Sequence, residues 1–418
     1  MSVARPLRAG GASRCGPMTR SAFAVPASAY VTAVCVIALF GYGTIAPLAA
    51  RLIDEGAGLS TLYRAGVLVL VLSSVALIAT RLRRPLVWAL MPMSAFMLLF
   101  GLRAAENAFV RDLPVYVGPD VLFGFLFGSA LLPAIAMAVN ADRLDDGAFA
   151  RAMSALLVVF LIGLAFNLEA LARSSETRLA LGKVNPIALS ALALDYLLFL
   201  MVFADRSRLV RVLSLLAVPI LVLVIAYAKS RGPLIATVLA LIVLFASGRR
   251  PLIGGAVAIL AGLGVFAALA MALLRLDLFA GTLARMRLDG GSAQIRLEQW
   301  RAAWTQFLDH PLFGDRIYET AFGFYPHNLF LESLIALGLA GTAILMIALI
   351  IAGRAAWTVL RDPAAPRFAV FTALVLVKAL GQSMVSGGIW GHTVLWIAMA
   401  MTIACALAAR RPFGGWSR

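Results

Sequence analysis

Long apolar runs recur along almost the whole chain, and they restrict its possible folds more than any other feature of the sequence. Each run has about 17 to 25 residues, which is enough for a helix to cross a bilayer. Apolar residues make up 62% of the 418 residues and charged residues only 13%, a composition foreign to soluble domains. Because hydrocarbon offers the backbone no hydrogen-bond partner, the runs must be helices. We predict an all-α, polytopic integral membrane protein.

Window hydropathy predicts about twelve membrane-spanning helices. In chain order, the predicted spans are 28–49, 65–80, 86–102, 121–139, 152–172, 187–204, 212–228, 233–247, 252–274, 327–352, 368–386 and 391–409. An even number of spans places both ends of the chain on the same side of the membrane.

Short loops rich in arginine decide the predicted orientation. If the spans alternate, one side of the membrane holds the arginines at 5–20, 81–84, 206–211, 249–250, 354–367 and 410–418. The positive-inside rule makes that side cytoplasmic and places both termini there. Residues 1–27 and 410–418 are then cytoplasmic tails, and 28–409 form a single membrane domain. Residues 1–27 lack a short apolar core before a small-residue cleavage site, so we interpret them as a tail, not a removed signal peptide.

One connection, residues 275–326, is about fifty residues long, far longer than loops usually are, and it lies on the extracytoplasmic side in this topology. Four apolar residues in it repeat at three- and four-residue steps: Leu297, Trp300, Trp304 and Phe307. This pattern predicts an amphipathic helix along the outer membrane interface, with the tryptophans as interfacial anchors. Ser292 could cap its start, and Pro311 should end it.

Polar residues stand at the outer ends of two predicted spans. The chain has only three histidines, and His327 stands with Asn328 where the long loop enters an apolar helix. The pair could simply cap that helix, or the histidine could act as a base. Lys229 and Arg231 occupy a tight outward turn between the seventh and eighth spans, either as cations that snorkel to the headgroups or as an anion site.

These features occur in a recognisable order. The chain presents, in sequence, Ser230-Arg231-Gly232, Arg296-x-x-x-Trp300, Pro311-Leu312-Phe313-Gly314, His327-Asn328 and Gly338-x-x-Gly341. With its many spans and late outward loop, the chain resembles the O-antigen ligase and polysaccharide polymerase superfamily over residues 229–341. It departs from the family pattern at Asp315-Arg316, where many members continue with glycine, and at Ala336, where an acidic residue is frequent.

The resemblance implies a metal-independent glycosyltransferase, without a nucleotide cofactor, on the periplasmic face of the bacterial inner membrane. Such enzymes take a glycan from an undecaprenyl-diphosphate carrier. The acceptor is a hydroxyl of lipid A core in ligases, of a second lipid-linked glycan in polymerases, or of a protein in one branch. The expected partners are these glycolipids and the membrane lipids, and no nucleic acid is expected.

The matched residues suit this chemistry. Arg231 and Arg296 match the family arginines, and guanidinium groups bind a diphosphate leaving group with a permanent charge. His327 matches the family histidine and would take the proton of the acceptor hydroxyl. A place in the first turn of a helix would keep its ring neutral. The residues expected to contact the substrates are Lys229, Arg287, Arg301, Asn328 and Glu332, the last as a possible substitute for the missing acid at Ala336.

An alternative function is a secondary transporter or flippase of a lipid-linked or small anionic substrate. About twelve helices with both ends inside is a common transporter layout, and Asp195 could be an ion site within a span. Asp195 could instead pair with Lys378 inside the bundle. The sequence shows no convincing internal repeat, which favours the enzyme. Charged residues of two outward loops are lesser candidates for substrate contact: Arg103, Glu106, Arg111 and Asp112 in one loop and Arg178 and Lys183 in the other. His392 is interpreted as interfacial.

Overall fold

The computed structural model describes residues 27–52, 58–76, 83–113, 117–167, 169, 179–181, 184–205, 207–249 and 291–409. Across these ranges the regular structure is helical, with two isolated backbone bridges, Leu181 with Val184 and Glu319 with Phe324. The predicted all-α class is confirmed for this part of the chain. The span 252–274 and Arg287 lie outside the described residues.

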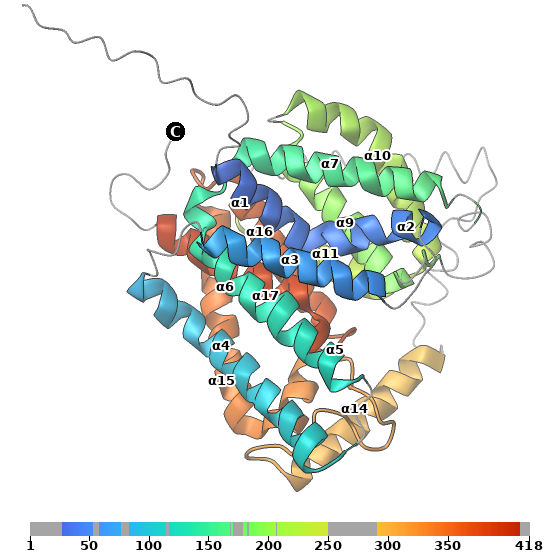
Figure 1. Ribbon diagram of the computed structural model, residues 1–418, viewed down its shortest axis with the longest axis vertical. Helices are drawn as coiled ribbons and strands as arrows, with labels where there is room; N and C mark the ends of the chain where they lie inside the picture. Colours follow the sequence, from blue (N-terminus) through green and yellow to red (C-terminus); the bar gives the residue numbers. More distant parts are fainter. Residues whose placement is uncertain are drawn as a thin grey trace, which may run out of the picture.

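Figure 1 shows the helices in the order in which they follow one another along the chain. Their bounds are α1 Ala27–Val36, α2 Tyr42–Leu52, α3 Gly58–Ala76, α4 Arg84–Ala105, α5 Pro119–Phe123, α6 Leu132–Val139, α7 Asp146–Ala165, α9 Pro186–Phe203, α10 Arg208–Ala228, α11 Arg231–Ala246, α14 Gly291–Asp309, α15 Leu329–Arg361, α16 Arg367–Ser383 and α17 Thr393–Ala409. Wider, π-helical turns join α1 to α2 and α5 to α6 and extend α4 to Val110.

By length and composition, seven helical stretches of the described chain are long and apolar enough to cross a membrane. They are Ala27–Ala49, Arg84–Val110, Pro119–Val139, Asp146–Ala165, Pro186–Phe203, Arg208–Ala228 and Leu329–Arg361. Shorter apolar helices cover Thr61–Val75, Arg231–Ala246 and Thr393–Ala409. Every predicted span other than 252–274 overlaps a described helix. The protein is therefore polytopic, and α15 continues nine residues past its predicted end at 352 because hydropathy detects only the apolar part of a helix.

Two helices form the centre of the bundle because they are apolar on every side. Helix α9 packs against α10, α11 and α16, and α17 packs against α6, α15 and α16. The charged residue of α9 is Asp195, whose carboxylate lies 2.7 Å from the Lys378 ammonium group of α16. The predicted pairing of these two residues is confirmed. Lys378 also donates to the Ala191 carbonyl at 2.6 Å.

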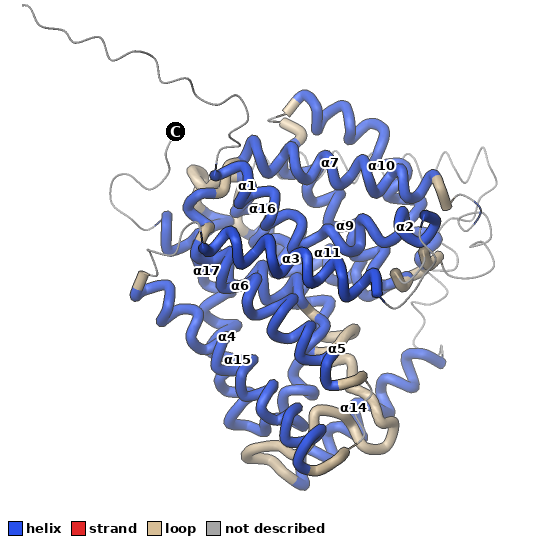
Figure 2. The backbone as a smooth tube through the Cα atoms, in the orientation of Figure 1, coloured by secondary structure: helices blue, strands red, loops and turns tan. Residues whose placement is uncertain are grey.

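Helices α4 and α15 lie side by side, and α14 lies against α15 near one end of the molecule (Figure 1). Figure 2 shows that loop segments gather around α14 at this end. As predicted, α14 ends at Asp309, before Pro311. Its buried face matches the predicted stripe only in part: Phe307 of that stripe packs with Ala303 against Ile335 of α15, while Leu297 and Trp304 are exposed. The difference arises because α14 has a second, protein-facing side that hydrophobic spacing does not reveal.

Candidate active site

The turn between α10 and α11 forms as predicted. Lys229 adopts a left-handed conformation with φ 48°, which ends α10, and Ser230 precedes Arg231, the first residue of α11. A side chain at Gly232 would come within 3.3 Å of Val385, so this turn packs tightly against the end of α16. Arg231 is thus held at the point where α11 begins and α16 has just ended.

Helix α14 presents Arg296 and Trp300 one turn apart, on the same face. The Trp300 indole N–H donates to the Pro326 carbonyl at 2.8 Å, which ties α14 to the residue before His327. This corrects our interpretation of Trp300 as an interfacial anchor. Burial, together with the charge of Arg231, lowers the pKa of Arg296. The two guanidinium groups are therefore electrostatic neighbours.

His327 lies in the loop that precedes α15. Its backbone has φ 55°, a conformation that is uncommon for a residue with a side chain. The ring centroid lies 4.7 Å from that of Tyr325 and 5.2 Å from that of Phe324, and Nδ1 is buried with no hydrogen-bond partner among the described residues. Burial, then the charges of Arg296 and of His392, lower the pKa of His327 to about 4. At neutral pH the imidazole is neutral and able to accept a proton.

Asn328 is the N-cap of α15. Its side-chain oxygen accepts from the backbone N–H groups of Phe330 and Leu331, both at 3.1 Å, which satisfies two unpaired donors of the first turn. Its amide group donates to the Met384 carbonyl at 3.1 Å, which links the start of α15 to the end of α16. His327 therefore precedes the cap. Our prediction that it lies in the first helical turn was wrong.

Glu332 lies in the first turns of α15, and His392 lies directly before α17. Glu332 is fully buried in the first turns of α15, and its carboxylate accepts from the Ile389 N–H at 2.9 Å. The carboxylate thus holds segment 386–392, in which the His392 Nε2 lies 2.7 Å from the Ser386 carbonyl oxygen. Burial lowers the pKa of His392 to about 4. These contacts give Glu332 a supporting role within the fold, and its contact with substrate stays a prediction. His392 is half-buried.

The remaining predicted contact residues are more scattered. Arg301 is exposed on α14, five residues beyond Arg296. Lys229 lies in the turn before Arg231. The charge of Arg231 thus acts on Arg296 and the charge of Arg296 acts on His327, whereas Arg301 is exposed on α14. Their contact with substrate remains a prediction.

Helix α15 is broken at Gly338, where φ is 64° and ψ −161°. The segment Pro311–Gly314 inserts at this break: the Leu339 N–H donates to the Pro311 carbonyl at 2.8 Å, and the Asp315 N–H donates to the Ile335 carbonyl at 2.8 Å. A Cβ atom at Gly338 would lie 2.4 Å from the Leu312 carbonyl carbon, so only glycine fits. The spacing of Gly338 and Gly341 is typical of a helix-packing contact, but the partner of Gly338 is this loop.

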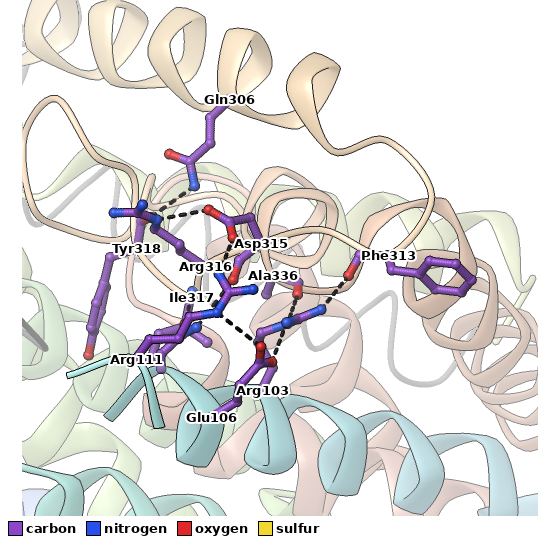
Figure 3. A network of polar contacts seen from close by, with 11 residues as sticks. Arg103, Glu106, Arg111, Gln306, Phe313, Asp315, Arg316, Ile317, Tyr318 and Ala336 are labelled. Carbon is purple, nitrogen blue, oxygen red and sulfur yellow. Dashed lines mark hydrogen bonds and ion pairs between the residues drawn. The ribbon is translucent and has the colours of Figure 1, made fainter. Parts of the chain in front are cut away.

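Arg103, near the end of α4, spans the break. Its Nε donates to the Ala336 carbonyl at 3.0 Å and one Nη to the Phe313 carbonyl at 2.9 Å, while its other Nη pairs with Glu106 (Figure 3). Ala336 is one of the carbonyls that the broken helix leaves without an intrahelical partner. The arginine therefore fastens the inserted loop and the broken helix to α4.

The same network continues along the π-helical end of α4 (Figure 3). Arg111 pairs with Glu106 at 3.0 Å and with Asp315, which also bonds Arg316 at 2.8 Å. Burial alone would raise the pKa of Asp315, but the two arginines outweigh it and hold that pKa below its usual value. Asn107, which is buried, donates to the Asp315 carbonyl at 3.2 Å and accepts from the Ile317 N–H at 3.0 Å.

Sequence reasoning had considered Arg103, Glu106 and Arg111 as substrate contacts and had overlooked Asn107. In the structure all four position the loop that leads to His327. A usable signal was present: Arg103 and Asn107 are four residues apart, so two polar residues share one face of an apolar helix. Such a face must meet polar partners within the protein.

The arrangement has a clear chemical capacity. Two neighbouring guanidinium groups can bind an oxyanion, and a neutral imidazole beside them can accept a proton. Among the described residues, no group of three His, Cys, Asp or Glu side chains is arranged to hold a metal ion.

Residues 216–346 match a family model described as O-antigen ligase. This segment contains Arg231, Arg296 and His327, together with the inserted loop and the break in α15. The resemblance predicted from the motif order is therefore confirmed. No curated protein matches the chain.

Proposed function

We propose, from the premise that residues 216–346 of this chain belong to the O-antigen ligase family, that the protein transfers a glycan from undecaprenyl diphosphate to an acceptor hydroxyl. The family supports a role in glycosyl transfer during polysaccharide or lipopolysaccharide synthesis in a multi-pass membrane protein. The observation that carries the finer proposal is the convergence of Arg231, Arg296 and His327 from three separate segments.

The two arginines would act on the leaving group. Cleavage of the bond between the sugar and the phosphate leaves both electrons on the diphosphate oxygen, which gains negative charge in the transition state. Burial, then the charge of Arg231, lower the pKa of Arg296, so the two like charges are unfavourable to each other. A diphosphate between them would relieve this repulsion and be stabilised most when its charge is greatest.

His327 would act on the acceptor. As the acceptor oxygen forms its bond to the anomeric carbon, its proton would pass to the unprotonated nitrogen of the imidazole. Burial and Arg296 keep that ring neutral before the reaction. The hydrogen bonds of Trp300 to Pro326 and of Asn328 to Met384 would fix the loop on both sides of His327.

The acceptor is either lipid A core, as in a ligase, or a second lipid-linked glycan, as in a polymerase. We place the reaction at the periplasmic face of the inner membrane, because the arginine-rich loops mark the opposite side as cytoplasmic. The transporter or flippase alternative rested on Asp195 as an ion site. The ion pair with Lys378 neutralises that carboxylate and so removes its main support.

The test is complementation of a strain that lacks the gene. Variants Arg231→Ala, Arg296→Ala and His327→Ala should insert in the membrane but leave undecaprenyl-diphosphate glycan unconsumed. His310→Ala and Arg354→Ala are matched controls, since both residues are exposed and lie away from the three, and they should restore surface glycan. Normal surface glycan in all three site variants would rule out the proposal.

The glycan profile of the deletion strain separates the two acceptors. Loss of every long chain from lipid A core indicates a ligase. Core that carries a single repeat unit indicates a polymerase.

A further inference from the structure

A cavity of about 1020 Å³ lies at the end of the bundle opposite to the candidate active site. Helices α7, α10 and α16 begin around it, and α9, α11 and α15 end there. Arg231 begins α11, whereas the cavity lies beyond the end of that helix at Arg249. The two sites are thus separated by the length of a membrane helix.

The charges that line this cavity are unbalanced. It is lined by four arginines, Arg151, Arg249, Arg361 and Arg367, and by a single acidic residue, Asp146. The Asp146 carboxylate is already engaged, since it accepts the backbone N–H groups of Arg367 at 3.0 Å and Phe368 at 2.8 Å. It caps α16 and pairs with none of the four guanidinium groups in the described part of the chain.

Arg249 is held in place without being neutralised. Its guanidinium donates to backbone carbonyls only, including those of Asp362 at 2.9 Å and Ala365 at 3.2 Å. These bonds satisfy carbonyls at the end of α15 and fix the guanidinium at the cavity wall. Burial, then the charge of Arg367, lower the pKa of Arg249, and the charges of Asp362 and Asp146 oppose this shift without reversing it.

Arg367 has an unmet hydrogen-bond donor. One Nη pairs with Asp205, but the other Nη is buried without a partner among the described residues. A buried unsatisfied donor on a charged group is costly, and a second cation beside it adds to the cost. An anion that accepted from Arg367 and neutralised Arg249 would remove both penalties.

The rim of the cavity indicates where such an anion comes from. Leu209 lines the cavity and is itself exposed, and it begins a row of exposed apolar residues along α10 that includes Val212, Leu215 and Leu216. The row follows the helix for two turns away from the cavity. A soluble phosphate would make no contact with this apolar row. A lipid with its headgroup in the cavity would place its acyl chains along the row.

We propose that this cavity binds the phosphate headgroup of an anionic phospholipid, with its acyl chains along α10. Basic pockets between membrane helices on the cytoplasmic side bind lipids of this class. The site is separate from the proposed glycosyl transfer and does not depend on it.

The experiment uses full-length protein purified in neutral detergent and stripped of lipid. Phosphatidylglycerol or cardiolipin should raise the thermal unfolding midpoint, and native mass spectrometry should detect bound lipid. Phosphatidylcholine and inorganic phosphate should do neither. The double variant Arg151→Gln with Arg361→Gln removes two exposed cavity charges. Each basic residue near a membrane surface strengthens anionic-lipid binding about five-fold, so this variant should bind roughly 25-fold more weakly.

The matched control is Arg84→Gln with Arg354→Gln. It removes the same number of charges from exposed positions at the same end of the bundle, but neither residue lines the cavity. The lipid affinity of this control should change less than about three-fold, because salt screens the interaction between distant surface charges. Equal weakening of both double variants, or equal stabilisation by inorganic phosphate and by lipid, would refute a lipid site.

Discussion

His327 is held neutral by its surroundings, and this sets the pH range in which it can act as a base. Because its pKa is lowered to about 4, the free enzyme needs no deprotonation of His327 at neutral pH. The dependence of kcat/KM on pH should be flat around neutrality and fall as the pH drops toward 4. Stability should also fall as the pH drops. Below about pH 6.5, His327 and His392 bind protons in the unfolded chain but not in the folded protein, so the free energy of unfolding decreases.

The contribution of Arg296 to this shift can be measured directly. Arg296→Gln removes a positive charge near the ring, so the pKa of His327 should rise. Diethyl pyrocarbonate modifies imidazole only in its neutral form. Mass spectrometry of the peptide that contains His327 therefore reports the titration of that residue. Exposed His310 serves as the internal reference, and Arg301→Gln, exposed on the same helix, should leave the midpoint in place. An unchanged midpoint in Arg296→Gln would show that the charge of Arg296 does not act on His327.

The ion pair of Asp195 and Lys378 makes a prediction about stability at the same scale. Asp195→Asn or Lys378→Met alone leaves a buried charge without its partner and should destabilise the protein by about 3–5 kcal/mol. The double variant Asp195→Leu with Lys378→Met removes both charges and should recover most of this loss. Thermal unfolding in detergent measures all three. Single variants as stable as the native protein would show that water already reaches the pair.

Residues that belong to an ordered set of motifs could be proposed from the sequence. Contacts that form only when distant segments fold together could not. Arg231, Arg296 and His327 were proposed from the order of their motifs. The hydrogen bond from Trp300 to Pro326 joins residues 26 positions apart in the chain. Helical periodicity reports which face a residue occupies but not which loop returns to that face.

At the scale of the helix, the break in α15 decides where the active-site loop lies. Gly338→Ala would place a Cβ atom 2.4 Å from the Leu312 carbonyl carbon and force a side chain into a conformation with φ 64°. Each effect costs about 1–3 kcal/mol, so we expect reduced stability and loss of glycan transfer. Thermal unfolding and surface glycan provide the two measurements.

Gly353→Ala is the matched control for this prediction. Gly353 lies in the same helix, and a Cβ atom there would meet nothing within 4 Å. Alanine favours a helix over glycine by about 1 kcal/mol, so this variant should be as stable as the native protein or more so. If the two alanine variants behaved alike, the inserted loop would not depend on the break.

Hydropathy predicted the spans because a bilayer requires long apolar helices, but it could not detect the break. Gly338 and Gly341 have the spacing of a helix-packing contact, and a positive φ leaves no mark on hydrophobicity. The network of Arg103, Asn107 and Asp315 was missed for a related reason. Its members come from segments more than 200 residues apart, and only the packing of α4 against α15 brings them together.

For the whole molecule, orientation is the prediction on which both proposed sites depend. Helix α15 is 33 residues long and would extend roughly 50 Å if unbroken, more than the hydrocarbon core. The loop before α15 and the exposed residues in its C-terminal turns should therefore lie on opposite sides of the membrane. The positive-inside rule places the end near Arg354 in the cytoplasm and the loop near His310 outside.

Cysteine labelling tests this orientation with little background. Cys35 and Cys405 are buried, so Cys15→Ser provides a chain with no other reactive thiol in the described part. A membrane-impermeant maleimide should label His310→Cys in intact spheroplasts and Arg354→Cys only after the membrane is disrupted. The reverse result would put the arginines of the proposed glycosyl transfer in the cytoplasm and the lipid cavity in the outer leaflet. Labelling of both from outside would mean that α15 does not cross the bilayer, since its ends could not otherwise be reached from one side.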